Sequence, residues 1–72
     1  MSDERISRMK TKDYQIYERT EGKWVIAHIV GETPAGLEAG INAYRHEFKF
    51  HDAGQPERLS SLTAEVKRWY RM

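Results

Sequence analysis

The chain of 72 residues contains no cysteine. This absence excludes disulfide bonds, cysteine-based zinc and iron–sulfur sites and a thiol nucleophile, and it agrees with a reducing compartment. The sequence also has no apolar run approaching the roughly 20 residues of a membrane-spanning helix, and its first residues show no signal-peptide pattern. We therefore expect a cytoplasmic protein with no membrane contact.

An excess of charge of one sign is also lacking. The chain holds 12 Lys and Arg against 11 Asp and Glu, a net charge of +1, which does not favour general binding to polyanions. The basic residues gather at the two ends: residues 1–12 hold four basic and two acidic side chains, and residues 67–72 hold three basic ones. These ends form one basic patch only if they meet in the fold; otherwise they are solvated termini.

The length limits the chain to one small domain with a thin core. Two Trp, four Tyr and two Phe supply the large apolar side chains of that core. We predict a single domain over residues 13–72. Residues 1–12 are predicted to form a frayed N-terminal arm with one weak helical turn around Ile6 and Met9.

A β-hairpin is the first element of the predicted domain. Apolar and polar residues alternate from Tyr14, the segment Thr20 to Lys23 is typical of a turn, and Gly22 can take the positive φ that hairpin turns require. The second strand carries apolar residues on both faces: Trp24, Ile26, His28 and Val30 on one, and Val25, Ala27 and Ile29 on the other. Both faces therefore need a cover, which a C-terminal helix or a second copy of the chain would supply.

An amphipathic helix is predicted after the hairpin. Thr33 is a good N-cap and Pro34 suits the first helical position. Its apolar stripe comprises Leu37, Ile41, Tyr44 and Phe48, and Gly36 and Gly40 lie one turn apart as a surface for close packing. Residues 47–51 alternate in polarity, so a short third strand competes there with a helix that ends near Lys49, and we favour the helix.

A second helix is predicted at the C-terminal end. Asp52 to Pro56 is a turn segment, and the spacing of Leu59, Leu62, Val66 and Trp69 is that of one helical face. Trp69 would be the core anchor of this helix or, alternatively, part of an exposed basic and aromatic surface. The predicted fold class is therefore α+β: a ββα unit followed by a C-terminal helix, in short ββαα.

No catalytic or metal-binding motif is recognisable. The spacing of His28, His46 and His51 matches no known metal site, and the carboxylates are scattered singly rather than paired. No Gly-rich loop lies between a strand and a helix. We expect no enzymatic activity, no metal and no cofactor.

Binding to another protein is therefore the leading functional hypothesis. A hairpin that is apolar on both sides and has two open edges favours a protein partner, a homodimer or both. We expect a small regulator or inhibitor that blocks its partner stoichiometrically, of the kind carried by phages and mobile elements. The predicted binding residues are Tyr17 and Lys23 on the hairpin and Glu38, Asn42 and Arg45 on the outer face of the helix.

Nucleic-acid binding is the alternative hypothesis. The C-terminal segment interleaves cations with aromatic residues, a combination that contacts phosphates and stacks on bases. The residues predicted for this role are Lys67, Arg68, Tyr70 and Arg71.

Overall fold

The predicted hairpin forms the centre of a sheet. The structure is a computed structural model, and it describes residues 6–48 and 54–69. Strand β2 (Tyr14–Glu21) pairs along its whole length with β3 (Trp24–Gly31), so that Ile16 lies opposite Ile29. Gly22 in the connecting turn has a φ of 61°, as predicted. The hairpin prediction is confirmed.

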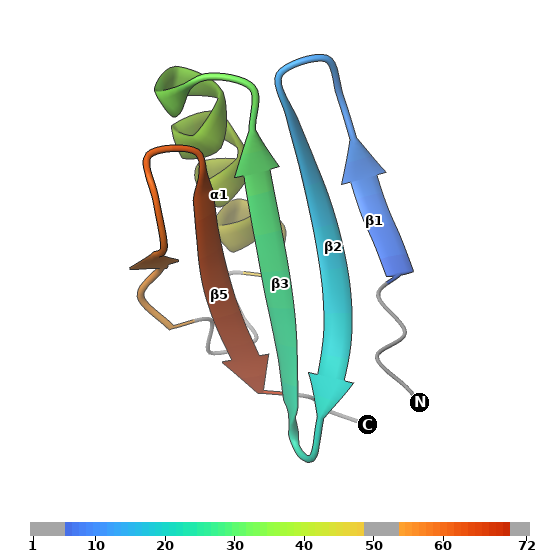
Figure 1. The fold of residues 1–72 in the computed structure, drawn as a ribbon. Helices are drawn as coiled ribbons and strands as arrows, with labels where there is room; N and C mark the ends of the chain where they lie inside the picture. Colours follow the sequence, from blue (N-terminus) through green and yellow to red (C-terminus); the bar gives the residue numbers. More distant parts are fainter. Residues whose placement is uncertain (1–5, 49–53, 70–72) are drawn as a thin grey trace.

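Three further strands extend this hairpin into a five-stranded antiparallel sheet. Strand β1 (Ile6–Lys10) pairs with β2, β5 (Thr63–Trp69) pairs with β3, and the short β4 (Glu57–Arg58) pairs with β5. The strand order is β1-β2-β3-β5-β4. Figure 1 shows the single helix of the described residues on one side of this sheet, so the domain is a small α+β fold.

Helix α1 (Pro34–Glu47) begins as the sequence predicts. The Thr33 hydroxyl caps it by accepting a hydrogen bond from the Gly36 N–H at 3.0 Å. Its apolar stripe joins residues of the sheet in one core, which comprises Ile16, Ala27, Ile29, Leu37, Ile41, Tyr44, Phe48, Ala64 and Val66. No helix in the described part of the chain is long and apolar enough to cross a membrane.

The two helix glycines allow the close packing that the sequence predicts. A Cβ atom on Gly36 would lie 2.4 Å from the carbonyl oxygen of Asp13, and one on Gly40 would lie 2.8 Å from Cγ2 of Ile29. Neither separation is possible without a shift. Gly36 therefore brings the helix backbone directly onto the loop before β2, and Gly40 brings it onto β2 and β3.

The predicted C-terminal helix is wrong, because residues 63–69 form strand β5. Of the four residues on its expected apolar face, Leu59 and Leu62 are 50% and 38% exposed and only Val66 joins the core. The segment forms a strand because the backbone N–H and C=O groups along one edge of β3 would otherwise be unpaired. Strand β5 pairs with that edge through seven consecutive residue pairs, from Trp24 with Trp69 to Val30 with Thr63.

One smaller expectation differs from the structure, and the structure decides part of the choice between helix and strand at residues 47–51. The weak helical turn expected in the N-terminal arm is wrong for Ile6–Lys10, which form β1 with an irregular register between Ser7 and Met9. Helix α1 ends at Glu47 and is capped by Phe48. The competing strand over residues 47–51 is therefore wrong for Glu47 and Phe48, and its residues 49–51 lie outside the described part of the chain.

Candidate protein-binding face

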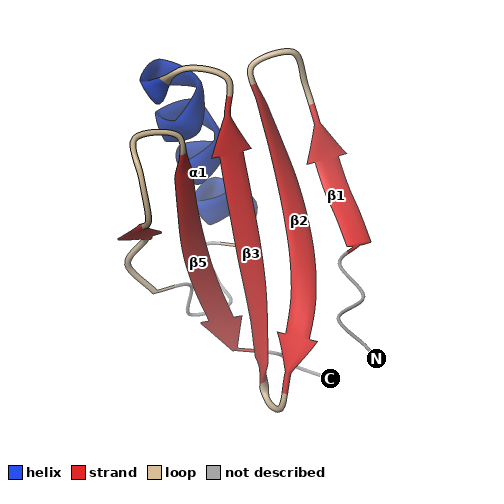
Figure 2. Ribbon diagram, viewed as in Figure 1, coloured by secondary structure: helices blue, strands red, loops and turns tan. Residues whose placement is uncertain are grey.

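The two faces of the sheet differ in what covers them. Successive side chains of a strand point to opposite faces, and α1 packs against the face that contains Ile16, Ala27 and Val66. Figure 2 shows α1 behind the sheet and no described helix or strand in front of it. We call this second side the open face.

The open face consists of four rows of side chains that cross β2, β3 and β5. Each row is named after its residue on β2, and the pairing of the strands fixes its members. The Gln15 row holds Gln15, Val30 and Thr63; the Tyr17 row holds Tyr17, His28 and Glu65; the Arg19 row holds Arg19, Ile26 and Lys67; and the Glu21 row holds Glu21, Trp24 and Trp69.

Two tryptophans form the aromatic end of the open face. Trp24 and Trp69 meet edge to face, with ring centroids 5.1 Å apart and an interplanar angle of 90°, and the Lys23 ammonium lies 5.9 Å from the Trp69 ring centre. A cross-strand aromatic pair stabilises a sheet by itself. Trp24 and Trp69 nevertheless remain 41% and 37% exposed. Neighbouring side chains bury Ile26, which is only 3% exposed.

Charged groups pair with one another in the middle of the open face. The Arg19 guanidinium donates hydrogen bonds to Glu21 at 3.0 Å and to Glu65 at 3.1 Å, and Nδ1 of His28 lies 3.2 Å from the same Glu65 oxygen. The bonds to Glu21 and Glu65 raise the pKa of Arg19. Partial burial of Glu65 works against ionisation, but the bonds from Arg19 and His28 outweigh it and lower its pKa.

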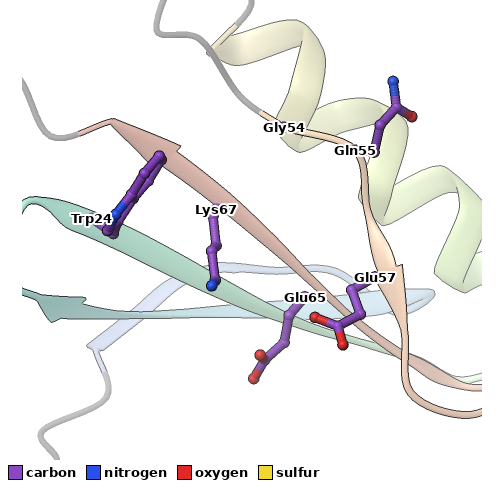
Figure 3. A pocket seen from close by; sticks show the side chains of 6 residues that line it. All are labelled: Trp24, Gly54, Gln55, Glu57, Glu65 and Lys67. Atoms are coloured by element: carbon purple, nitrogen blue, oxygen red, sulfur yellow. The ribbon is translucent and has the colours of Figure 1, made fainter.

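A groove of about 310 Å³ borders the open face on the side of β4. Its lining residues are Trp24, Gly54, Gln55, Glu57, Glu65 and Lys67. Figure 3 shows Lys67 between Trp24 and Glu65, with Glu57 beside Glu65. Glu57 lies directly opposite Glu65 in the strand pairing, so the groove combines an aromatic wall with charges of both signs.

The helix-covered face holds a closed polar network instead. The Tyr44 hydroxyl donates to Glu18 at 2.7 Å and accepts from Nε of Arg68 at 2.8 Å. Burial and the bond to Glu18 raise the pKa of Tyr44. The guanidinium carbons of Arg8 and Arg68 lie 4.6 and 3.9 Å from the centre of the Phe48 ring.

The two basic ends of the chain therefore do meet, through Arg8 and Arg68. They meet around acidic groups, since both guanidiniums lie within ion-pair distance of Glu18 and Arg8 also contacts Glu47 at 2.6 Å. These two cations are paired within the fold and do not form a free basic patch.

The residues predicted for protein binding lie on two opposite sides of the molecule. Tyr17 is half-buried on the open face, and Lys23 is exposed in the β2–β3 turn. Glu38 and Asn42 are exposed on α1, Arg45 is half-buried there, and Glu38 forms an ion pair with Arg58. The structure therefore separates the predicted set into a sheet surface and a helix surface.

The residues predicted for nucleic-acid binding are separated as well. Because β5 is a strand, Lys67 points to the open face and Arg68 points to the helix-covered face, where it is paired. The expected arrangement along one helix is wrong. Tyr70 and Arg71 lie outside the described residues, and Trp69 lies on the exposed surface rather than in the core.

Sequence reasoning missed Arg19, Glu65 and Trp69 as neighbours on one surface. The signal that could have placed Glu65 and Trp69 is the alternation of Ala64 and Val66 with Thr63, Glu65 and Lys67, which is typical of a strand. Among the described residues, no three His, Asp or Glu side chains group closely enough to hold a metal ion. Comparison with protein-family models, curated proteins and solved structures found no match to this chain.

Proposed function

We propose that this protein is a small non-enzymatic regulator that binds another polypeptide chain stoichiometrically through its open face. The observation that carries this proposal is the exposure of Trp24 and Trp69 on a face over which no described element lies. Exposed aromatic surface with polar neighbours is characteristic of protein interaction sites. Trp, Tyr and Arg are also the residues that most often dominate the energy of binding at interfaces, and the open face holds all three.

The face is a better docking surface than the edges of the sheet. Both edges of the hairpin are already paired, one with β1 and the other with β5. Neither edge is therefore open to the strand addition that the sequence predicts. The outer strands are poor templates too. Strand β1 has an irregular register and carries Lys10, and β4 has two residues. Short, charged and irregular edges discourage the addition of another strand.

The chemistry of the open face favours binding over catalysis. The bonds from Arg19 and His28 lower the pKa of Glu65, and this carboxylate is therefore a poor general acid near neutral pH. The groove beside it, at about 310 Å³, lies at the lower end of the range for small-molecule sites. A regulator of this kind would inhibit its target by covering a surface that the target needs.

Site-specific photo-crosslinking in the native host tests the proposal. A photoreactive phenylalanine derivative replaces Lys67 on the open face, and the same derivative replaces Asn42 on the exposed side of α1 as a matched control. We expect a defined protein adduct from position 67 and none from position 42. Adducts from position 42 alone, or none from position 67, would contradict the assignment of the open face.

Binding of single-stranded nucleic acid is the second candidate function. Trp24 and Trp69 are exposed beside Lys23 and Lys67, and bases stack on such rings while ammonium groups contact phosphates. Glu21 lies in the same row as the tryptophans and weakens this candidate. Affinity for an oligonucleotide should fall steeply between about 50 and about 200 mM salt if phosphate contacts drive binding. An absence of binding at low salt would exclude it.

A further inference from the structure

We propose that the chain bound at the open face is a second copy of this protein, packed sheet against sheet about a two-fold axis. The axis lies between the two sheets, runs across the strands, and passes between the Tyr17 row and the Arg19 row. This inference rests on the proposed function, because it takes the open face as a protein-binding surface and names its occupant.

The order of the rows selects this axis. A two-fold rotation about it places the Tyr17 row of one copy over the Arg19 row of the other, and the Gln15 row over the Glu21 row. Every contact then occurs twice, as a closed symmetric interface requires. The strands of the two sheets run nearly antiparallel across the interface, which is the aligned arrangement of sandwich proteins.

Charge complementarity is the first argument for a second copy. The rotation brings Glu65 of one copy opposite Lys67 of the other, because both residues lie on β5 on either side of the axis. Lys67 is exposed and makes no ion pair with a described residue of its own chain. The same rotation brings the ring of Tyr17 opposite the guanidinium of Arg19, a combination that favours cation–π contact.

The distribution of apolar groups is the second argument. Val30, half-buried at one end of the open face, comes opposite Trp24 of the second copy, and Thr63 comes opposite Trp69. The aromatic end of each copy is thereby covered by the end of the other copy whose residues on β2, β3 and β5 carry no charge. A single chain offers no such cover among its described residues.

The size of the face predicts a reversible dimer. At ordinary spacings of about 4.8 Å between strands and about 3.3 Å between residues, the four rows on three strands cover roughly 400 Å² per copy. Interfaces of this size belong to the weak and transient class. Both helices would form the outer layers of the dimer, so the second copy would not cover Glu38, Asn42 and Arg45.

Sedimentation velocity on the full chain tests the dimer directly. Between about 5 and about 500 µM, we expect the mass to rise from that of one chain towards twice that value, because weak interfaces form in this range. The mass of one chain is 8.5 kDa. The variant Lys67→Glu should weaken association at least about tenfold, since it places a carboxylate opposite Glu65. The control Lys12→Glu makes the same charge change outside the face and should leave association unchanged.

A mixing experiment tests the symmetry of the contact. Lys67→Glu and Glu65→Lys each place like charges at both copies of this contact, whereas a heterodimer of the two variants restores opposite charges at both. We expect each variant alone to associate at least about tenfold more weakly than the wild type, and the mixture to associate more strongly than either variant. Glu65→Lys also removes the partner of Arg19 and His28. Isotope-filtered NMR on the unaltered protein therefore provides a second measurement, with contacts expected between Trp24 of one copy and Val30 of the other.

Three results would overturn this inference. They are a strict monomer at every concentration, a dimer that Lys67→Glu leaves intact, and a dimer without contacts between Trp24 and Val30. The inference and the proposed function fail separately. A monomer that still crosslinks from position 67 to a different protein refutes the second copy and supports the open face, whereas a strict monomer without any adduct from position 67 refutes both.

Discussion

The two faces of strand β3 are held in place by different physical means. On the helix-covered face, Val25, Ala27 and Ile29 are at most 4% exposed and pack in the apolar core. On the open face, Trp24 remains 41% exposed and its neighbours contact one another through ring and ion-pair contacts. Substitutions on the covered face should therefore reduce stability, and substitutions of the exposed residues on the open face should mainly reduce the proposed binding.

Adjacent residues on β3 give the largest expected difference between the faces. Ile29→Ala should lower the free energy of unfolding by about 2–5 kcal/mol, because Ile29 is fully buried and its truncation leaves a cavity. Val30→Ala, one residue further on the open face, should cost less than about half as much, since Val30 retains contact with solvent. Urea denaturation measures the free energy of unfolding of both variants. Equal losses of stability would show that the open face is covered.

A glycine of α1 gives the next largest effect. Gly36→Ala should destabilise the protein by about 1–3 kcal/mol, even though Ala favours helices, because its Cβ would lie 2.4 Å from the Asp13 carbonyl oxygen. The matched control is Gly54→Ala, whose Cβ would lie at an ordinary 3.7 Å from the Lys67 carbonyl oxygen. Thermal unfolding should distinguish the two variants. A neutral Gly36→Ala would contradict the close packing of α1 on the sheet.

Removal of the Tyr44 hydroxyl should have an intermediate effect. Tyr44→Phe keeps the ring in the core but takes one partner from each of Glu18 and Arg68, at a cost of about 1–3 kcal/mol. The fold raises the pKa of Tyr44. The hydroxyl therefore contributes fully to stability at pH values below its ordinary pKa of about 10, and this contribution is lost as the pH rises through the raised pKa. Unfolding measured from neutral to alkaline pH should therefore show a steeper loss for the wild type than for the variant.

The ion pairs of the open face should contribute least to stability. Glu65→Gln should cost up to about 1 kcal/mol at neutral pH, as partly exposed pairs usually do. Since the fold lowers the pKa of Glu65, its contribution is present above about pH 4 and is lost as the pH falls through the lowered value. Acid titration of unfolding should show a shallower slope for this variant. Glu57→Gln removes a carboxylate that no described side chain pairs with, and it should cost less at neutral pH.

The correctly predicted elements are those with local signals. Gly22 permits the tight turn between β2 and β3, and Thr33 caps α1, so the hairpin and the helix follow from short stretches of sequence. Strands β1 and β5 depend on partners distant in the chain. The spacing of Leu59, Leu62 and Val66 fits a helix equally well. The segment that contains Val66 forms a strand because β3 would otherwise have an unpaired edge. The local spacing of apolar residues carries no information about an unpaired strand edge elsewhere in the chain.

The candidate site was predictable only in part for the same reason. Tyr17 and Lys23 belong to the hairpin and were expected near a binding surface, since one strand and its turn place them. Trp69 comes opposite Trp24 only through the register of β5, which joins residues 45 positions apart in the sequence. The open face is therefore a product of the sheet topology rather than of any one segment.

The fluorescence of tryptophan tests the assignment of the open face most directly, because both tryptophans of the sequence lie on it. Acrylamide quenching should be measured on the free chain and on the complex, whether that complex is the dimer at high concentration or the adduct partner added in excess. We predict that complex formation shifts the emission to the blue and reduces quenching as Trp24 and Trp69 leave water. A complex that forms with unchanged emission and unchanged quenching would contradict the account.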